Sequence, residues 1–154
     1  MQGSGRVDNA DLYRVLYAAE SPGFACAEAF GSYGVWSDDM FSIPGLGASM
    51  AIATLDLEAD RTVLDLDDPI ALADRGIRPS RVVTSDRAVS RSWARSIFNE
   101  GSWCGVRWWS YYDADWGSIA IWDPGLLRVI KVEGLKRSHP AIEEARQRLH
   151  RLWL

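Results

Sequence analysis

The stretch Arg14-Val-Leu-Tyr-Ala-Ala-Glu-Ser-Pro-Gly-Phe-Ala-Cys-Ala-Glu-Ala-Phe-Gly31 passes from one kind of secondary structure to another. Residues 14–18 are rich in strand formers and predict a short buried strand. Ser21 and Pro22 then predict the start of a helix, because serine caps helix N-termini and proline fits the first helical position. Gly31 is expected to end this helix. A strand that leads directly into a helix indicates a domain that mixes both.

The rest of the chain continues this mixture. Further strands are predicted at residues 50–58, 62–66, 104–109, 118–122 and 126–132. Helices are predicted at residues 69–75, capped by Asp68, at 86–99, capped by Ser85, and at 139–153, opening at Pro140. Residues 31–49 are rich in glycine and predict a long surface loop. The pattern therefore indicates an α+β fold, in which helices flank a compact mixed or antiparallel sheet.

Composition limits what kind of protein this is. The chain has 154 residues, of which 47% are hydrophobic and 25% charged, so we expect one globular domain over residues 1–154. Its net charge of −4 argues against direct binding to nucleic acid, which requires a basic surface. No run is apolar enough for a membrane span or a signal peptide, and Cys26 and Cys104 are read as core residues. We therefore expect a cytoplasmic protein.

No metal site or familiar nucleotide loop is expected. His139 and His150 lack cysteine or acidic partners at the spacing of a zinc site. The short glycine motifs lead neither to a Walker lysine nor to a Rossmann turn. Four of the eight tryptophans lie within residues 103–116, which marks either a corner of the core or an aromatic pocket.

Four polar residues remain as candidates for a site: Arg6, Tyr17, Glu28 and Ser110. Three of them have simpler interpretations. Arg6 can be a solvated side chain, Tyr17 a core residue with a satisfied hydroxyl, and Ser110 a turn residue. Glu28 is harder to explain in this way, because its neighbours in the helix are apolar and a pocketed carboxylate needs an arginine or a ligand.

Three blocks of the sequence resemble the RES domain family, which occurs as the toxin of toxin–antitoxin pairs. The first block is Gly5-Arg6-Val7-Asp8-Asn9. The second is Val15-Leu-Tyr-Ala-Ala-Glu-Ser-Pro22 followed by Ala27-Glu-Ala-Phe30. The third runs from Ser92-Trp-Ala-Arg95 to Gly105-Val-Arg-Trp-Trp-Ser110. Together they span most of residues 5–123.

The resemblance implies an ADP-ribosyltransferase-like fold and an enzyme that consumes NAD⁺ as substrate, by phosphorolysis or hydrolysis, without a cofactor. It also implies a cognate antitoxin with a helix-turn-helix DNA-binding domain. Glu28 would stabilise the oxocarbenium-like transition state, and Arg6 would grip the pyrophosphate or an attacking phosphate. Tyr17 would stack on the nicotinamide ring, and Ser110 would donate to ribose or phosphate. Arg6, Glu28 and Ser110 are thus expected to be catalytic, and Arg6, Tyr17 and Ser110 to bind NAD⁺.

Two alternatives remain open: a catalytically silent protein-binding module of the same fold, and an ADP-ribosyltransferase that modifies a macromolecule. The oligomeric state, a homo-oligomer included, also stays open. Family members carry an additional segment before the Gly-Arg block, whereas five residues precede Arg6 here. Because chain ends fray, we expect Arg6 to be held loosely and the activity to be weak or absent for that reason.

Overall fold

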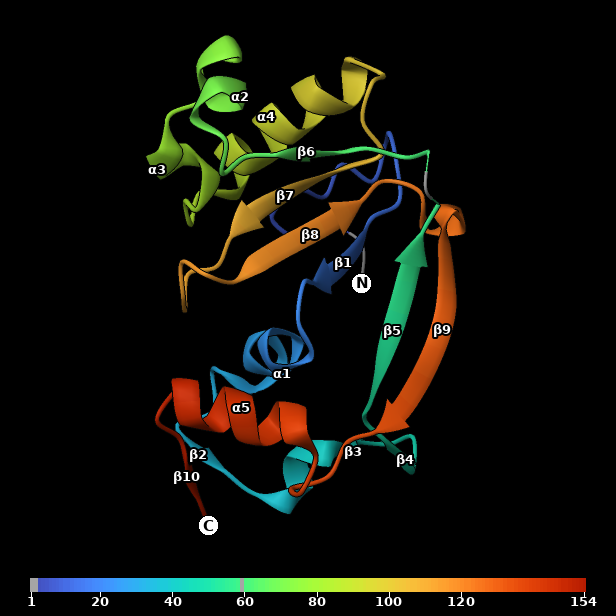
Figure 1. Cartoon of the computed structure of the whole chain (residues 1–154), viewed down its shortest axis with the longest axis vertical. Helices are drawn as coiled ribbons and strands as arrows, with labels where there is room; N and C mark the ends of the chain where they lie inside the picture. Colours follow the sequence, from blue (N-terminus) through green and yellow to red (C-terminus); the bar gives the residue numbers. More distant parts are fainter. Residues whose placement is uncertain (1–2, 59) are drawn as a thin grey trace. The chain divides into compact units, whose positions relative to one another are not determined.

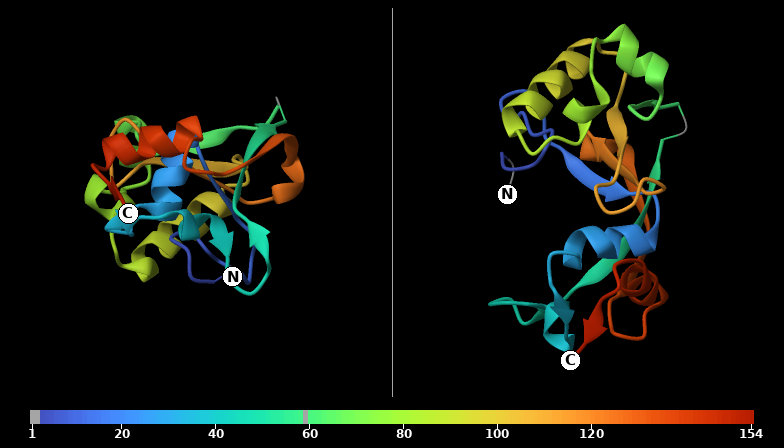
Figure 2. Two further views of the ribbon diagram at one scale, coloured as in Figure 1. Left: turned by 90° about the horizontal axis from the view of Figure 1, so that it is seen from below. Right: turned by 90° about the vertical axis from the view of Figure 1, so that its left-hand side faces the viewer.

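The computed structural model describes residues 3–58 and 60–154. The chain divides into two compact units, each made of two separate segments. The first unit holds the chain up to Ala18 together with Leu57–Arg128, and the second holds Ala19–Asp56 together with Val129–Leu154. The colours of Figures 1 and 2 follow the chain through these segments. The expectation of a single domain over residues 1–154 stays a prediction.

The first unit contains a four-stranded mixed sheet with the strand order β1-β8-β7-β6. Its strands are β1 (Leu16–Ala19), β6 (Val63–Asp65), β7 (Gly105–Trp109) and β8 (Gly117–Ile121). Strands β6 and β7 are parallel, whereas β7 and β8 are antiparallel. The predicted strands at 104–109 and 118–122 are confirmed within one residue at each end.

Three helices belong to this unit and lie next to the sheet in Figure 1. They are α2 (Pro69–Asp74), α3 (Pro79–Val82) and α4 (Arg87–Asn99), and a short 3-10 turn η2 (Pro124–Leu126) follows β8. The prediction of Ser85 as the cap of the third helix is wrong by one residue, because the Asp86 carboxylate accepts from the Ala88 amide at 2.9 Å. The buried face of α4 packs in one core with β7 and β8.

The tryptophan-rich stretch at 103–116 forms part of this core. Trp108 and Trp116 are buried, and Trp103 and Trp109 are partly buried and pack against the core cluster. Because side chains alternate along a strand, Trp108 and Trp109 leave β7 on opposite sides.

The second unit is built around two packed helices, α1 (Pro22–Phe30) and α5 (Pro140–Arg148). The Ser21 hydroxyl accepts from the Phe24 amide at 3.2 Å, as the sequence predicted for the helix start. The helices pack closely where Gly23 faces Glu144, since a methyl group at Gly23 would overlap that carboxylate. The other elements are β2 (Val35–Trp36), η1 (Asp38–Phe41), β3 (Ser42–Ile43), β4 (Ala48–Ser49), β5 (Ala51–Leu57), β9 (Leu127–Gly134) and β10 (Leu152–Trp153).

Residues 31–49 differ from the predicted surface loop. They contain β2, η1 and a hairpin of β3 and β4, and Trp36 among them is fully buried. The Trp36 indole nitrogen donates to the Phe30 carbonyl at 3.2 Å. The glycines predicted turns correctly, but the prediction of a surface loop missed that Trp36 packs in the core between those turns.

The predicted C-terminal helix over 139–153 is too long. Helix α5 ends at Arg148, and His150 adopts a positive φ of 52°, which breaks the helix. Strand β10 then pairs in parallel with β2, so that Trp153 lies opposite Trp36. The ring of Trp153 packs edge-on against Trp36 at 5.9 Å. Aromatic packing in the second unit therefore overrides the helical periodicity of the sequence.

We expect Trp153→Ala to lower the free energy of unfolding by about 2 to 3 kcal/mol, below the range for fully buried tryptophans because Trp153 is partly exposed. The ring contacts Trp36 and Phe41, and the Arg137 guanidinium lies 4.6 Å from its centre. Urea unfolding measures the effect. The matched control is Leu154→Ala, an 87% exposed neighbour that should change stability by less than about 0.5 kcal/mol. Equal effects of the two variants would contradict this account of β10.

Candidate functional site

The short segment around Arg6 is organised by a buried carboxylate, Asp8, which is only 4% exposed. One oxygen of Asp8 accepts from the backbone amides of Gly3 at 2.6 Å and Gly5 at 2.8 Å. The other oxygen accepts from the Tyr17 hydroxyl at 2.7 Å. A buried carboxylate is stable only when donors replace its water, and three donors do so here.

Tyr17 closes this network from β1. Its hydroxyl donates to Asp8 and accepts from the Val7 amide at 3.0 Å. The hydroxyl lies so close to Gly5 that a methyl group there would overlap it, which explains a glycine before Arg6. The Tyr17 ring meets Trp108 of β7 edge-on, with 6.4 Å between the ring centres. Tyr17 thus joins the Gly-Arg segment to the sheet.

The network shifts the pKa values of both acids in opposite directions. Burial raises the pKa of Asp8, but the hydrogen bonds from Tyr17, Gly5 and Gly3 outweigh burial and leave its pKa below the ordinary value. Burial, together with the hydrogen bond to Asp8, raises the pKa of Tyr17 well above its ordinary range. Asp8 therefore stays ionised and Tyr17 stays protonated near neutral pH.

Helix α4 holds the same segment from its other side. The Ser90 hydroxyl donates to the Arg6 carbonyl at 2.6 Å. The Arg91 guanidinium donates to the carbonyls of Gly3 at 2.7 Å and Gly5 at 3.3 Å. The backbone on both sides of Arg6 is thereby attached to a regular helix.

The Arg6 side chain is also held. Its Nη1 donates to the Val82 carbonyl at 3.1 Å and the Thr84 carbonyl at 2.5 Å, between α3 and α4. Two bonds from one nitrogen fix the plane of the guanidinium. The expectation that Arg6 is loosely held is therefore wrong, because backbone and side chain are both pinned by the first unit.

Ser110 follows β7 directly and is 5% exposed. Its hydroxyl accepts from the Tyr112 amide at 3.0 Å, and its own amide donates to the Trp116 carbonyl at 2.7 Å. These bonds shape the loop between β7 and β8. Strand alternation places Ser110 on the same side as Trp108, the residue that Tyr17 touches. Arg6, Tyr17 and Ser110 thus all belong to the first unit.

Glu28 belongs to the second unit. It lies on α1, whose buried residues are Gly23, Phe24, Cys26, Ala27 and Phe30, and its own side chain is exposed. Cys26, Ala27 and Phe30 are buried, whereas Glu28 and its neighbour Ala29 are exposed. The sequence placed Glu28 correctly on a helix.

Asp8, Ser90 and Arg91 are the residues of this region that sequence reasoning missed. Asp8 belongs to the Gly-Arg block. Its position between Val7 and Tyr13, which are both buried, could have indicated a buried carboxylate. Ser90 also had a signal, since it stands on the apolar face of α4. Arg91 had none, because an arginine on a helix usually faces solvent.

Within the described residues, no group of three or more histidine, cysteine, aspartate or glutamate side chains is placed to hold a metal ion. Cys26 and Cys104 are free thiols, and burial raises the pKa of both. No helix in the described part of the chain has the length and apolar character needed to cross a membrane.

Comparison with known proteins gives this architecture a family. A family model described as the RES domain matches residues 1–143, and the chain therefore belongs to the RES domain family. Among solved structures, the crystal structure of the M. tuberculosis MbcT–MbcA toxin–antitoxin complex contains a similar chain, with a TM-score of 0.65 and 18% identity. The match covers 92% of this chain and 76% of that chain. It supports the ADP-ribosyltransferase-like α+β fold that the sequence predicted. No curated protein matches this sequence.

Tyr17→Phe tests the network around Asp8. The change leaves the Val7 amide unpaired and removes one of the donors to a buried carboxylate, so we expect the free energy of unfolding to fall by about 1 to 3 kcal/mol. Tyr111→Phe, the same change at a residue that is 86% exposed, should have no measurable effect. Denaturant unfolding of both variants decides, and a wild-type midpoint for Tyr17→Phe would show that the hydroxyl adds nothing to stability.

The same variant should unfold more readily in acid. The lowered pKa of Asp8 contributes stability that is present above the unfolded value of about 4 and is lost as the pH falls through the lower folded value. Without the Tyr17 donor the folded pKa of Asp8 rises, so this contribution shrinks and acid unfolding begins at a higher pH. Circular dichroism between pH 6 and pH 2 measures the midpoint, and identical midpoints for wild type and Tyr17→Phe would contradict the role of this hydrogen bond.

Proposed function

We propose that this chain is the toxin of a toxin–antitoxin pair and cleaves the bond between nicotinamide and ribose in NAD⁺. The observation that carries the proposal is the construction around Arg6. In a member of the RES domain family, a buried carboxylate, the Tyr17 hydroxyl and α4 all serve to hold one short segment and its guanidinium. Several hydrogen bonds that hold one charged side chain in place are typical of a ligand-binding site rather than of core packing.

Arg6 is suited to the phosphates of the substrate. A planar guanidinium binds pyrophosphate or inorganic phosphate through paired hydrogen bonds, and it does so best when its plane is fixed beforehand. The carbonyls of Val82 and Thr84 provide this fixation. We assign to Arg6 the positioning of NAD⁺ or of an attacking phosphate.

Tyr17 and Ser110 supply two further contacts. The high pKa of Tyr17 keeps the ring neutral, and a neutral tyrosine ring can stack on the nicotinamide. The Ser110 hydroxyl, which accepts from the Tyr112 amide, is assigned to a hydrogen bond with a ribose or phosphate oxygen. Both residues belong to the same unit as Arg6.

Glu28 is assigned to the reacting carbon. As the bond from C1′ of the ribose to the nicotinamide nitrogen breaks, its electron pair leaves with neutral nicotinamide, and the ribose becomes an oxocarbenium ion. A carboxylate stabilises this cation or binds the ribose hydroxyls. A new C1′–O bond then forms to inorganic phosphate or to water, and the attacking oxygen gives up a proton when water is the acceptor. An acceptor group on a macromolecule would make the chain an ADP-ribosyltransferase instead.

An antitoxin is the proposed protein partner, in which a helix-turn-helix domain would bind DNA. The support is the structural neighbour, which is a toxin–antitoxin complex. The acidic net charge of −4 suits a toxin that leaves DNA binding to its partner.

Nicotinamide release from NAD⁺, measured with and without phosphate, tests the proposed reaction. We expect Glu28→Gln to lower the rate about a hundredfold, the effect of one lost transition-state contact, with little change in the thermal midpoint because Glu28 is exposed. The matched control is Glu58→Gln, an exposed glutamate of the first unit that should keep full activity.

The outcomes separate the alternatives. Folded wild-type protein without nicotinamide release would contradict NAD⁺ cleavage and leave the silent binding module. Release that requires an added protein or nucleic acid, with label transferred to it, would make the chain an ADP-ribosyltransferase. Full activity of Glu28→Gln would remove Glu28 from the reaction.

A further inference from the structure

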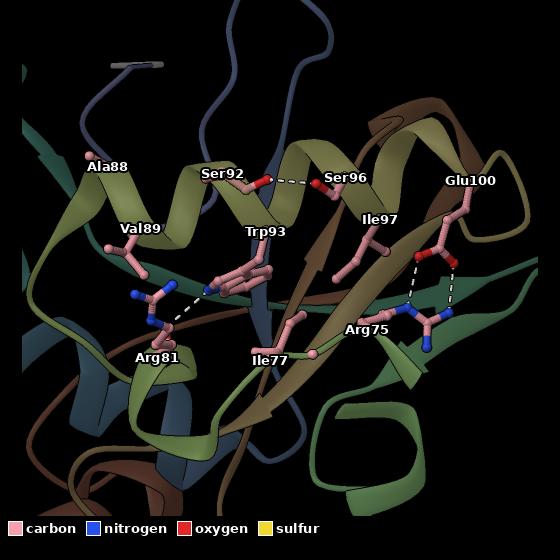
Figure 3. A pocket seen from close by; sticks show the side chains of 11 residues that line it. Arg75, Ile77, Arg81, Ala88, Val89, Ser92, Trp93, Ser96, Ile97 and Glu100 are labelled. Atoms are coloured by element: carbon pink, nitrogen blue, oxygen red, sulfur yellow. Dashed lines mark hydrogen bonds and ion pairs between the residues drawn. The ribbon is translucent and has the colours of Figure 1, made fainter. Parts of the chain in front are cut away.

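A groove of about 460 Å³ runs along one face of α4 in the first unit. Figure 3 shows α4 along one side and the segment from Arg75 to Arg81 along the other, with Trp93 in the middle of the groove. The residues of α4 that line it recur at helical spacing from Ala88 to Glu100, which corresponds to a length of about 18 Å. This is the shape of a site for a peptide segment rather than for a compact molecule.

The floor of the groove is apolar and fixed in place. Trp93 is 6% exposed, and its indole nitrogen donates to the Arg81 carbonyl at 3.0 Å. Ile77 and Ile97 flank the Trp93 ring, as Figure 3 shows. The serines Ser92 and Ser96 stand on the rim and are exposed. An apolar floor with a polar rim suits an amphipathic segment.

The two ends of the groove differ in charge. At the far end, Arg75 and Glu100 neutralise each other through hydrogen bonds of 2.8 Å and 2.6 Å. At the end where α4 begins, the exposed Arg81 lines the groove. Arg87, the first residue of α4, and Arg78, three residues before Arg81, are exposed as well. No side-chain hydrogen bond or ion pair is found for these three arginines within residues 3–58 and 60–154.

This basic end stands out against the rest of the chain. Residues 78–87 contain three arginines and one acidic residue, Asp86, in a protein whose net charge is −4. The Asp86 carboxylate caps the N-terminus of α4 and offsets the positive potential of the helix end, so the net positive charge here comes from the arginines. A net positive charge beside an apolar floor is complementary to a segment that carries carboxylates and apolar anchors.

We propose that this groove binds an acidic amphipathic segment of a protein partner. Its apolar side chains lie over Ile77 and the exposed edge of Trp93, and its carboxylates lie toward Arg78 and Arg81. Nucleic acid fits less well, because base-independent binding needs a continuous basic track, and this groove ends at a neutral ion pair. The inference does not depend on NAD⁺ cleavage, since it uses none of Arg6, Tyr17, Glu28 and Ser110.

Two labelled 16-residue peptides serve as probes. The acidic one consists of four Leu-Leu-Glu-Glu repeats, and the basic one has lysine in place of every glutamate. Fluorescence anisotropy at physiological ionic strength measures their binding to the whole chain. We expect the acidic peptide to bind and the basic one not to. A double variant, Arg78→Glu with Arg81→Glu, should weaken binding of the acidic peptide about tenfold or more, because like charges then meet at the basic end.

Two further variants separate the groove from general electrostatics. Arg14→Glu makes the same change at an exposed arginine outside the groove and should leave the affinity nearly unchanged. Ser96→Trp fills the groove from an exposed position without altering charge, and it should abolish binding while leaving the thermal midpoint in place.

Three results would overturn the proposal. The first is equal binding of both peptides, and the second is equal weakening by Arg14→Glu and by the double variant. The third is tight binding of a single-stranded RNA 12-mer that Arg78→Glu with Arg81→Glu abolishes while the acidic peptide does not bind. Nicotinamide release by the same preparations reports separately on the proposed enzymatic activity.

Discussion

Buried negative charge needs donors, and the donors that Asp8 recruits determine how the first unit is assembled. The carboxylate takes two backbone amides from the glycines before it and a hydroxyl from β1. These bonds hold residues 3–8, a glycine-containing segment that would otherwise be mobile, as a strap against α4. The position of the Arg6 side chain follows from that strap. Removing the charge would therefore affect the segment that carries Arg6 before it affected the core.

Local signals in the sequence predicted much of the fold. Ser21-Pro22 and Gly31 bracket α1 as expected, because a cap and a helix stop act on neighbouring backbone groups. The strands on either side of residues 110–116 were recognisable from their apolar residues. Arg6, Tyr17 and Ser110 lie in one unit, whereas Glu28, from the same block as Tyr17, lies in the other.

What the sequence did not reveal depends on contacts between distant residues. Leu149 and Leu152 continue the helical period of α5, yet the packing of Trp153 against Trp36 and Phe41 makes a strand more favourable at the end of the chain. The anchoring of Arg6 was hidden for the same reason, since Val82 and Thr84 lie far along the sequence and bind it through carbonyl oxygens, which every residue has. The sequence therefore gives no signal for a hydrogen bond to a backbone carbonyl.

The interleaved course of the chain has a consequence for synthesis on the ribosome. All four strands of the mixed sheet have been made by residue 121, so the first unit can fold while the later chain is still being added. Helix α1, with nine residues, is too short to be stable alone and must wait for α5 to cover it. Because β10 lies after α5 in the chain and pairs with β2, the second unit is completed later than the first. The partners of the Arg6 segment are therefore synthesised before α5, which packs against the helix that bears Glu28.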